Sequence, residues 1–397
     1  MRNRSLGLTL FSGLAILVAA CGPGASPSPS AASSAPSTAP GSSAPSTEAS
    51  SAPASAAAQS DLKIGVVTDI GTLNDKNYNE YSFKGAQEGA AAIGAAEPTS
   101  IVPTSAAEYG PSIKSFVDQK FDVIITVGFN LASATVQAAH DNPDIWFLGV
   151  DQSPICVNKD GLPDATFACE GDAKTLLPKY ISVWFQEDQA GYLAGIVAAG
   201  ATKSNVIGAI GGTSICAPCV RYIQGYELGA KSVKPDIKVV SAYVTNDFSA
   251  AAFQDQAGGK TYAEAFLAQN KTLDVLFQVA GLTGNGVLDA ACAANILGIG
   301  VDVDQFNSYP NAQPCLLTSA EKHLQLAVSD ALKAIAGGSP TVGDVLYDAK
   351  NDGIGVSVGH NKSGAWAQDT QTKLNTAIAG MKDGSLKTCP DKCGSLK

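Results

Sequence analysis

Histidine is scarce in this chain, and lysine and arginine form no cluster. The three histidines, His140, His323 and His360, form no HExxH motif and no ligand-spaced group, which argues against a catalytic zinc site. The chain holds 26 Lys and Arg against 36 Asp and Glu, for a formal net charge of -10. Nucleic acids bind mainly through neutralised phosphates, so this balance argues against a nucleic-acid partner. An anionic lipid surface would repel the same charge, so contact with a membrane would need an anchor.

Motifs of covalent chemistry are missing as well. There is no GxSxG nucleophile elbow. Residues 258–261 read Gly-Gly-Lys-Thr, like the end of a phosphate-binding loop, but the earlier glycine would fall at Gln254 and the motif fails. The glycine-rich residues 281–286 form no GxGxxG fingerprint; they are either a tight strand-to-helix turn or a loop whose N–H groups hold a ligand oxygen. We expect no enzymatic activity, no cofactor and no metal.

A short apolar run with a basic start opens the chain. Arg2 and Arg4 precede the apolar residues 6–18, and Ala-Ala-Cys21 follows. The run is too short to span a membrane and is typical of a secretion signal. Val-Ala-Ala-Cys21 resembles the lipobox of bacterial lipoproteins, whose cysteine is acylated; the alternative is cleavage nearby with Cys21 incidental. We predict a lipoprotein signal peptide over residues 1–21 and an anchor at Cys21 on the extracytoplasmic side of the cell membrane.

Residues 22–60 are almost wholly Ser, Ala, Pro and Thr. Such a segment cannot bury a core, and we expect a disordered tether. A globular body follows from about Asp61. At 45% hydrophobic and 16% charged residues, the chain has enough apolar material for one or two cores.

The body contains eight of the nine cysteines, all but Cys21. An even number in an exported protein predicts disulfides. The cysteines fall in sequence-local couples: Cys156 with Cys169, Cys216 with Cys219, Cys292 with Cys315, and Cys389 with Cys393. Residues 216–219 also form a CxxC, but neither a second zinc-ligand pair nor a thioredoxin-like context is evident. A structural disulfide is therefore expected there too.

Strand-like and helix-like segments alternate through the body, which predicts two doubly wound lobes with parallel sheets. The first unit has expected strands at 63–69, 100–103, 121–127 and 145–151 and helices at 77–93, 106–119 and 131–140. The second has expected strands at 205–210, 238–244, 273–280 and 297–303 and helices at 189–199, 219–233, 260–268 and 285–293. A helix at 320–335, strands at 344–347 and 353–358, and a helix at 365–379 follow.

The stretch 63–85 has the layout of a ligand site. A buried strand ends at Asp69, a turn follows, and Asn74 or Asp75 can cap a helix that starts near Lys76. Ligands of open parallel sheets bind outside the carboxyl ends of the strands, so Asp69 would point into the crevice. The alternative is a turn aspartate beside a capping one.

Residues 69–79, Asp-Ile-Gly-Thr-Leu-Asn-Asp-Lys-Asn-Tyr-Asn, resemble the opening motif of the basic membrane lipoprotein family, the purine nucleoside receptors of ABC transporters. Further segments look like blocks of this family in family order: 127–129, 149–151, 185–195, 221–226, 277–284, 300–305 and 318–322. Together they cover most of residues 61–335. The resemblance implies a type I periplasmic-binding-protein fold whose two hinged lobes close on a ligand. The expected lobes are 61–182 plus 319–345 and 183–318 plus 346–397.

The resemblance also implies a set of ligand contacts. Tyr78 stands where the family stacks an aromatic on the purine, and Phe253 where the partner ring comes from the other lobe, with Phe248 as a rival. Each stack would contribute on the order of 1–3 kcal/mol, by analogy with nucleic-acid bases. The alternative is that these rings are plain core residues. The tyrosine replaces the commoner phenylalanine, and its hydroxyl is expected to contact ligand or the opposite lobe.

Three aspartates that end strand-like runs, Asp69, Asp151 and Asp302, would accept hydrogen bonds from base N–H groups or ribose hydroxyls. A neutral ligand rich in donors suits such carboxylates, whereas a phosphate or carboxylate would be repelled. The alternative is a solvated strand end.

The remaining implied contacts are Lys322, Gly281 and Asn79. Lys322 is expected near a helix start, where a cation opposes the helix dipole unless a carboxylate or ligand offsets it. Gly281 would allow close backbone approach, and Asn79 would add a contact.

The sequence thus predicts a monomeric lipoprotein that captures a purine nucleoside and presents it to an ABC permease. The alternatives are another small polar ligand such as a sugar, a sensor for a membrane kinase, and, least favoured, nucleoside hydrolysis by the aspartates.

Overall fold

The computed structural model describes residues 60–69, 71–360, 366 and 368–394. The predicted signal peptide, the anchor at Cys21 and the tether lie outside the described residues. No helix in the described part of the chain is long and apolar enough to cross a membrane.

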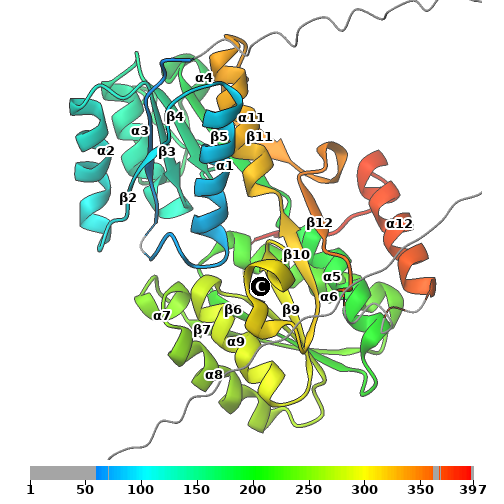
Figure 1. Cartoon of the computed structure of the whole chain (residues 1–397). Helices are drawn as coiled ribbons and strands as arrows, with labels where there is room; N and C mark the ends of the chain where they lie inside the picture. The colour runs from blue at the N-terminus through cyan, green and yellow to red at the C-terminus, as the bar shows by residue number, and fades with distance from the viewer. Residues whose placement is uncertain (1–59, 70, 361–365, 367, 395–397) are drawn as a thin grey trace, which may run out of the picture. The chain divides into compact units, whose positions relative to one another are not determined.

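Two six-stranded sheets form the two lobes (Figure 1). The first has the order β11-β5-β4-β3-β1-β2 and is parallel throughout. Its strands are β1 (Ile64–Val67), β2 (Thr99–Ile101), β3 (Val123–Val127), β4 (Trp146–Val150), β5 (Tyr180–Phe185) and β11 (Gly343–Tyr347). Buried β-branched runs such as Ile-Gly-Val-Val in β1 and Val-Ile-Ile-Thr-Val in β3 suit strands covered on both faces.

The second sheet has the order β12-β10-β9-β8-β6-β7. Its strands are β6 (Val206–Thr213), β7 (Lys238–Thr245), β8 (Val275–Val279), β9 (Leu297–Asp302), β10 (Leu316–Lys322) and β12 (Ile354–Val356). All pairings are parallel except that of β12 with β10. The predicted α/β fold with two parallel-sheet lobes is confirmed.

Helices follow most strands, as parallel connections require. Those before the second sheet begins are α1 (Tyr78–Ala92), α2 (Tyr109–Asp118), α3 (Ala132–Asp141), α4 (Ala173–Leu176) and α5 (Glu187–Ala201). Later come α6 (Ala217–Val233), α7 (Ala250–Phe253), α8 (Gln256–Gln269), α9 (Gly281–Ala293), α10 (Gln305–Ser308), α11 (Leu324–Ala336) and α12 (Gln368–Asp383). Helix α11 packs on α1 of the first lobe, although β10 just before it belongs to the second sheet.

The structure corrects the predicted elements at two strands. Residues 180–185 form β5, which was not expected although Tyr-Ile-Ser-Val-Trp-Phe is rich in β-branched and aromatic residues. The helix expected at 320–335 begins only at Leu324. Ala320, Glu321 and Lys322 favour helices by propensity, but they pair with β9 and β12, and this tertiary pairing overrides the local preference.

The chain crosses between the sheets after β5, after β10 and between β11 and β12. The expected lobe boundaries at 182, 319 and 345 fall inside β5, β10 and β11, so the strands place each crossing a few residues later. Because a strand pairs along its whole length, the chain crosses to the other lobe only after the strand has ended.

Four disulfides join the couples predicted from the sequence: Cys156–Cys169, Cys216–Cys219, Cys292–Cys315 and Cys389–Cys393. The last lies in a C-terminal segment that packs on the start of α5. The Thr388 hydroxyl donates to Asp188 Oδ2 at 2.5 Å, and the Gly394 N–H donates to Gln224 Oε1 at 3.0 Å.

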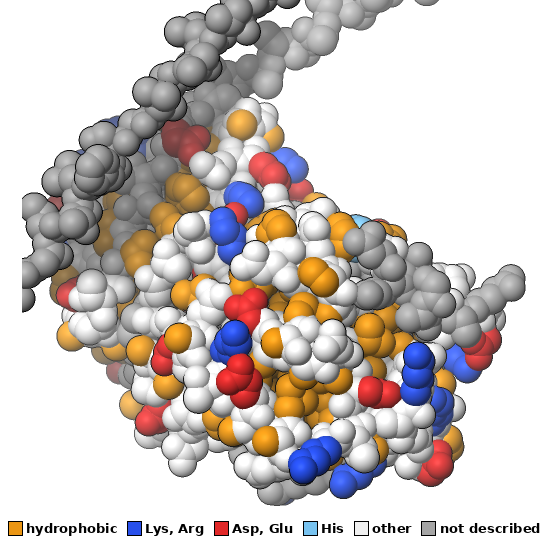
Figure 2. Space-filling view, turned by 60° about the horizontal axis from the view of Figure 1, so that its bottom comes forward, with side chains coloured by type: hydrophobic (Ala, Val, Ile, Leu, Met, Phe, Trp, Pro, Cys, Tyr) orange, Lys and Arg blue, Asp and Glu red, His pale blue; other side chains and the backbone are white. Residues whose placement is uncertain are grey.

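Basic side chains do not gather on the face of the second lobe that Figure 2 presents. Lys and Arg lie there singly or in small groups, several of them next to Asp or Glu. This face therefore offers no continuous basic patch of the kind that binds nucleic acid.

Glycines let α5 and α6 approach until their backbones touch. A Cβ added at Gly195 would lie 2.1 Å from the Tyr226 carbonyl oxygen, and one at Gly229 would lie 1.9 Å from that of Tyr192. Backbone atoms cannot move aside as a flexible side chain can, so these positions tolerate no larger residue without separating the helices.

Gly229→Ala should therefore lower the free energy of unfolding by about 1–3 kcal/mol, the usual cost of overpacking. Gly110→Ala is the matched control, because its Cβ in α2 would meet nothing within 4 Å. It should raise the free energy by up to about 1 kcal/mol through higher helix propensity. Urea denaturation followed by circular dichroism measures both, and equal stability of the two variants would contradict this account of the packing.

Candidate functional site

A cavity of about 110 Å³ lies between the two lobes, where loops at the ends of strands from both sheets meet. All eight residues predicted to bind ligand line it: Asp69, Tyr78, Asn79, Asp151, Phe253, Gly281, Asp302 and Lys322. Asp69, Asp151 and Asp302 lie at the carboxyl ends of β1, β4 and β9, the edge where ligands of parallel sheets bind. The structure brings the predicted set together; the role of each member toward a ligand stays a prediction.

Lys322, the last residue of β10, is buried among carboxylates from both lobes. Its Nζ lies 2.5 Å from Asp151 Oδ2, 3.7 Å from Glu187 Oε1 and 3.7 Å from Asp302 Oδ1. The same Nζ lies 4.7 Å from the centroid of the Tyr78 ring. Burial by itself lowers the pKa of Lys322, but the three carboxylates outweigh it and hold that pKa above its ordinary value. The positive charge of Lys322 near the start of α11 is thus offset by a group of carboxylates.

Two members of this charge network were not assigned a role from the sequence. Glu187 is fully buried at the start of α5, and its Oε2 lies 2.7 Å from Arg221 Nε on α6. Both residues fall in segments that resemble family blocks. Their place in these segments was the signal that the sequence offered.

Burial raises the pKa of the two aspartates next to Lys322. Burial raises the pKa of Asp302 to about 6, although Lys322 and the Tyr222 hydroxyl, which donates to its Oδ1 at 3.2 Å, act against the rise. Burial also raises the pKa of Asp151, with Lys322 as the main opposing influence. Both have a positive φ, 60° for Asp151 and 65° for Asp302. Such backbone strain recurs at functional sites.

Asp69 is oriented by its own lobe. The Tyr109 hydroxyl donates to its Oδ1, and the Asn130 amide donates to its Oδ2 at 2.9 Å. Gly128, at φ 111°, passes so close that an added Cβ would lie 2.9 Å from the Asp69 side chain. This aspartate is therefore held at the cavity and is not a solvated strand end.

Asn77 occupies the N-cap position of α1, and Asp75, one of the two candidate caps, supplies the side-chain oxygens that accept from the first N–H groups of this helix. Its carboxylate accepts from the backbone N–H of Asn77 at 2.9 Å, Asn79 at 2.8 Å and Glu80 at 3.1 Å. Burial raises its pKa to about 6 despite these hydrogen bonds. Asp75 also lines the cavity, so the side chain that binds the start of α1 also forms part of the cavity wall.

The aromatic residues come from both lobes. The Tyr78 hydroxyl donates to the Val150 carbonyl oxygen at 3.3 Å, a contact within its own lobe. Its expected contact with a ligand stays a prediction. Phe253 and its rival Phe248 both line the cavity. Phe248 also meets Phe129 of the first lobe, with ring centroids 5.1 Å apart.

A chain of side-chain amides joins the lobes beside the cavity. Asn285 Nδ2 donates to the Asp75 carbonyl oxygen at 3.1 Å, and Gln305 Nε2 donates to Asn285 Oδ1 at 2.8 Å. Gln278 Nε2 then donates to Gln305 Oε1 at 2.6 Å. The glycine-rich residues 281–286 form the first turns of α9, and their contribution to this chain through Asn285 was not predicted.

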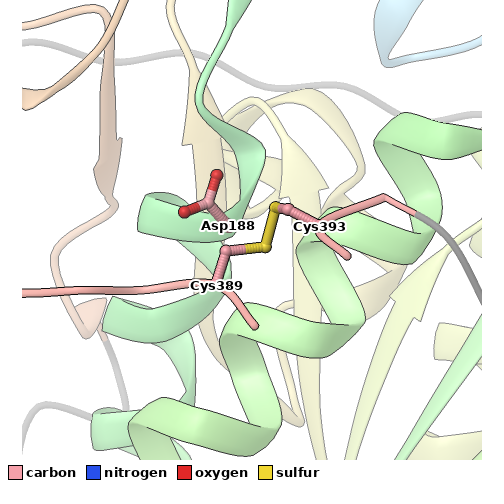
Figure 3. A group of neighbouring side chains, drawn as sticks. All are labelled: Asp188, Cys389 and Cys393. Carbon is pink, nitrogen blue, oxygen red and sulfur yellow. A yellow bond between two sulfur atoms is a disulfide. The ribbon is translucent and has the colours of Figure 1, made fainter. Parts of the chain in front are cut away.

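One group of possible metal ligands occurs among the described residues, namely Asp188, Cys389 and Cys393 (Figure 3). The two sulfurs are bonded to each other and are not thiolates, and Asp188 accepts a hydrogen bond from Thr388. Zinc-binding cysteines are thiolates, so we assign no metal to this group.

Lys322→Met should lower the free energy of unfolding by about 3–5 kcal/mol, because it leaves buried carboxylates without their cation. Lys114→Met is the control: its partner Asp118 is exposed, and such pairs contribute about 0–1 kcal/mol. Urea denaturation at pH 7.5 measures both. Similar losses in the two variants would contradict the buried network.

Asp302 should make stability depend on pH. Its pKa of about 6 in the folded state exceeds the 3.8 of an ordinary aspartate, so the native state binds more protons and loses stability as pH rises through 6. In the Asp302→Asn variant the side chain at this position does not titrate. The wild type should therefore gain up to about 3 kcal/mol relative to the variant between pH 7 and pH 4. Denaturation of both proteins across this range tests it, and a constant difference would contradict it.

Comparison with known proteins identifies the family. Residues 62–382 match the family model described as Bmp, ABC transporter substrate-binding protein PnrA-like. The chain is 32% identical over 352 residues, 84% of this chain and 90% of the relative, to the ABC transporter nucleoside-binding protein BmpA of Lactococcus lactis subsp. cremoris. It is 26% identical, over 74% of this chain and 68% of the relative, to an uncharacterized lipoprotein of Pyrococcus abyssi.

A solved structure supports the fold. The ABC transporter solute-binding protein of Aeropyrum pernix K1 superposes with a TM-score of 0.68 at 22% identity, covering 83% of this chain and 94% of that one. The matched family consists of substrate-binding proteins of ABC transporters, which are not enzymes, and this role implies a permease partner. The chain belongs to the Bmp family of PnrA-like substrate-binding proteins of ABC transporters.

Proposed function

We propose that this substrate-binding protein captures a purine nucleoside between its lobes. The observation that carries the proposal is the cavity lining, which combines aromatic rings from both lobes with several carboxylates. The relative from Lactococcus lactis, named as nucleoside-binding, supports it at 32% identity.

The charges of the lining favour a neutral ligand with many hydrogen-bond donors. The charged residues that line the cavity are Asp69, Asp75, Asp151, Asp302 and Lys322, four acids and one base. The single ammonium is already surrounded by carboxylates. A phosphate would meet uncompensated negative charge in a low-dielectric site, whereas ribose hydroxyls and base N–H groups would donate to the carboxylates.

The aromatic lining suits a planar ring. Tyr78 comes from the first lobe and Phe253 from the second, so a base held between them would contact both lobes. Stacking of a base on an aromatic side chain contributes about 1–3 kcal/mol per ring. A ligand that contacts both lobes favours the closed arrangement over the open one.

The proposed location is the outer face of the cell membrane. The lipobox-like Val-Ala-Ala-Cys21 and the Ser/Ala/Pro/Thr tether of residues 22–60 would hold the lobes near the permease that receives the ligand. The Pyrococcus abyssi relative, named as a lipoprotein, supports this placement. We propose that the protein works as a monomer.

Calorimetric titration with inosine, guanosine and adenosine, against ribose, glucose and inosine monophosphate, tests the ligand class. We expect saturable binding of at least one nucleoside, weaker binding of the sugars, and little binding of the monophosphate because of its charge. No heat from any nucleoside would overturn the proposal, and tight binding of a sugar alone would favour the alternative.

Phe253→Ala should weaken nucleoside binding at least about tenfold, since it removes one stacking ring. Phe248→Ala tests the rival ring, and Phe167→Ala is the control because Phe167 is 80% exposed and does not line the cavity. Calorimetry gives the affinities. Unchanged binding by Phe253→Ala would remove this ring from the site.

A further inference from the structure

The Cys216–Cys219 disulfide lies in the wall of the cavity. Strand β6 ends at Thr213, and α6 begins at Ala217, so the pair opens a 17-residue helix directly after the first strand of the second sheet. Both cysteines line the cavity together with Pro218, which stands between them. From the sequence alone no context for this CxxC was evident; the structure supplies one.

Closing the short loop between Cys216 and Cys219 contributes little to stability. The bonded cysteines are only 3 residues apart, compared with 23 for Cys292–Cys315. In the chain-entropy model the stabilisation falls as the closed loop shortens, so this pair contributes less than the longer loops do. Its position in the cavity wall is what sets it apart.

Groups that point to a ligand line the same cavity as the disulfide. Tyr222 lies one turn beyond Cys219 on the same face of α6, and its hydroxyl donates to Asp302 Oδ1 at 3.2 Å. Asp151, 8% exposed, lines the same cavity, and its Oδ1 has no hydrogen-bond partner within the described part of the chain. The first turn of α6 therefore faces a space that contains an unpaired acceptor.

We propose that the Cys216–Cys219 disulfide is a ligand-contacting group that packs its sulfurs against the bound molecule. This inference deepens the proposed function and rests on it. A disulfide presents a polarisable surface without a donor, and sulfur packs well against aromatic rings. It suits the ring of a nucleoside, while the carboxylates accept from the ligand's donors.

The test compares two double variants by calorimetry with inosine. Cys216→Ala with Cys219→Ala should weaken binding about three- to tenfold, the range expected for lost sulfur–aromatic contacts. The matched control is Cys389→Ala with Cys393→Ala, which also removes a short-range disulfide, with a separation of 4 residues, but outside the cavity. It should change the affinity less than twofold. Wild-type affinity in the first variant would overturn the proposal.

A second readout uses the wild-type protein and does not depend on how the variants fold. A phosphine reductant splits the S–S bond into two thiols and becomes a phosphine oxide with oxygen from water; N-ethylmaleimide then labels the thiols for mass spectrometry. Saturating inosine should slow labelling of Cys216 and Cys219 and leave that of Cys389 and Cys393 unchanged. Equal labelling with and without inosine would overturn the proposal even if the variant binds more weakly.

The proposed function and this inference can fail separately. If the wild type binds D-ribose but no nucleoside, the proposed function fails, and both readouts repeated with D-ribose decide whether the disulfide contacts the ligand. If it binds neither, both proposals are overturned.

Discussion

The ammonium of Lys322 is the group on which the junction of the two lobes depends. It ends a strand of the second sheet and lies 2.5 Å from Asp151, which follows a strand of the first. Burying such charges is costly, and their mutual attraction offsets the cost only while every partner stays in place. Glu187 and Arg221 extend the network onto α5 and α6, where glycines bring the helices into backbone contact. Packing and electrostatics therefore constrain the same junction.

This network also shapes what the cavity can hold. Three carboxylates, Asp151, Asp302 and Glu187, surround Lys322, and Arg221 pairs with one of them. Burial raises the pKa of Asp302 to about 6, and the neighbouring carboxylates of Asp151 and Glu187 add to this rise. Donors on a neutral ligand would stabilise these carboxylates, so the electrostatics that join the lobes would also favour such a ligand.

The contacts between lobes lie close to the proposed ligand. Asn285 reaches the Asp75 carbonyl oxygen, and Phe248 meets Phe129, beside or within the cavity lining. The direct contacts and a ligand stacked between the lobes would favour the same arrangement, and each would add to the stability of the closed state. The start of α1 belongs to this system too, because Asp75 binds it and faces the cavity.

The sequence by itself determined most of the strands and helices and the strand-end aspartates, because buried β-branched runs and turn residues are local signals. Its resemblance to a family predicted Tyr78, Phe253 and Lys322 as ligand contacts. Only the tertiary structure decided that Glu187 joins Lys322, that residues 320–322 form a strand, and that the CxxC faces the cavity. The physical reason is sequence distance: Lys322 and Asp151 are 171 residues apart and Asn285 and Asp75 are 210 apart, and local spacing carries no signal for contacts at such separations.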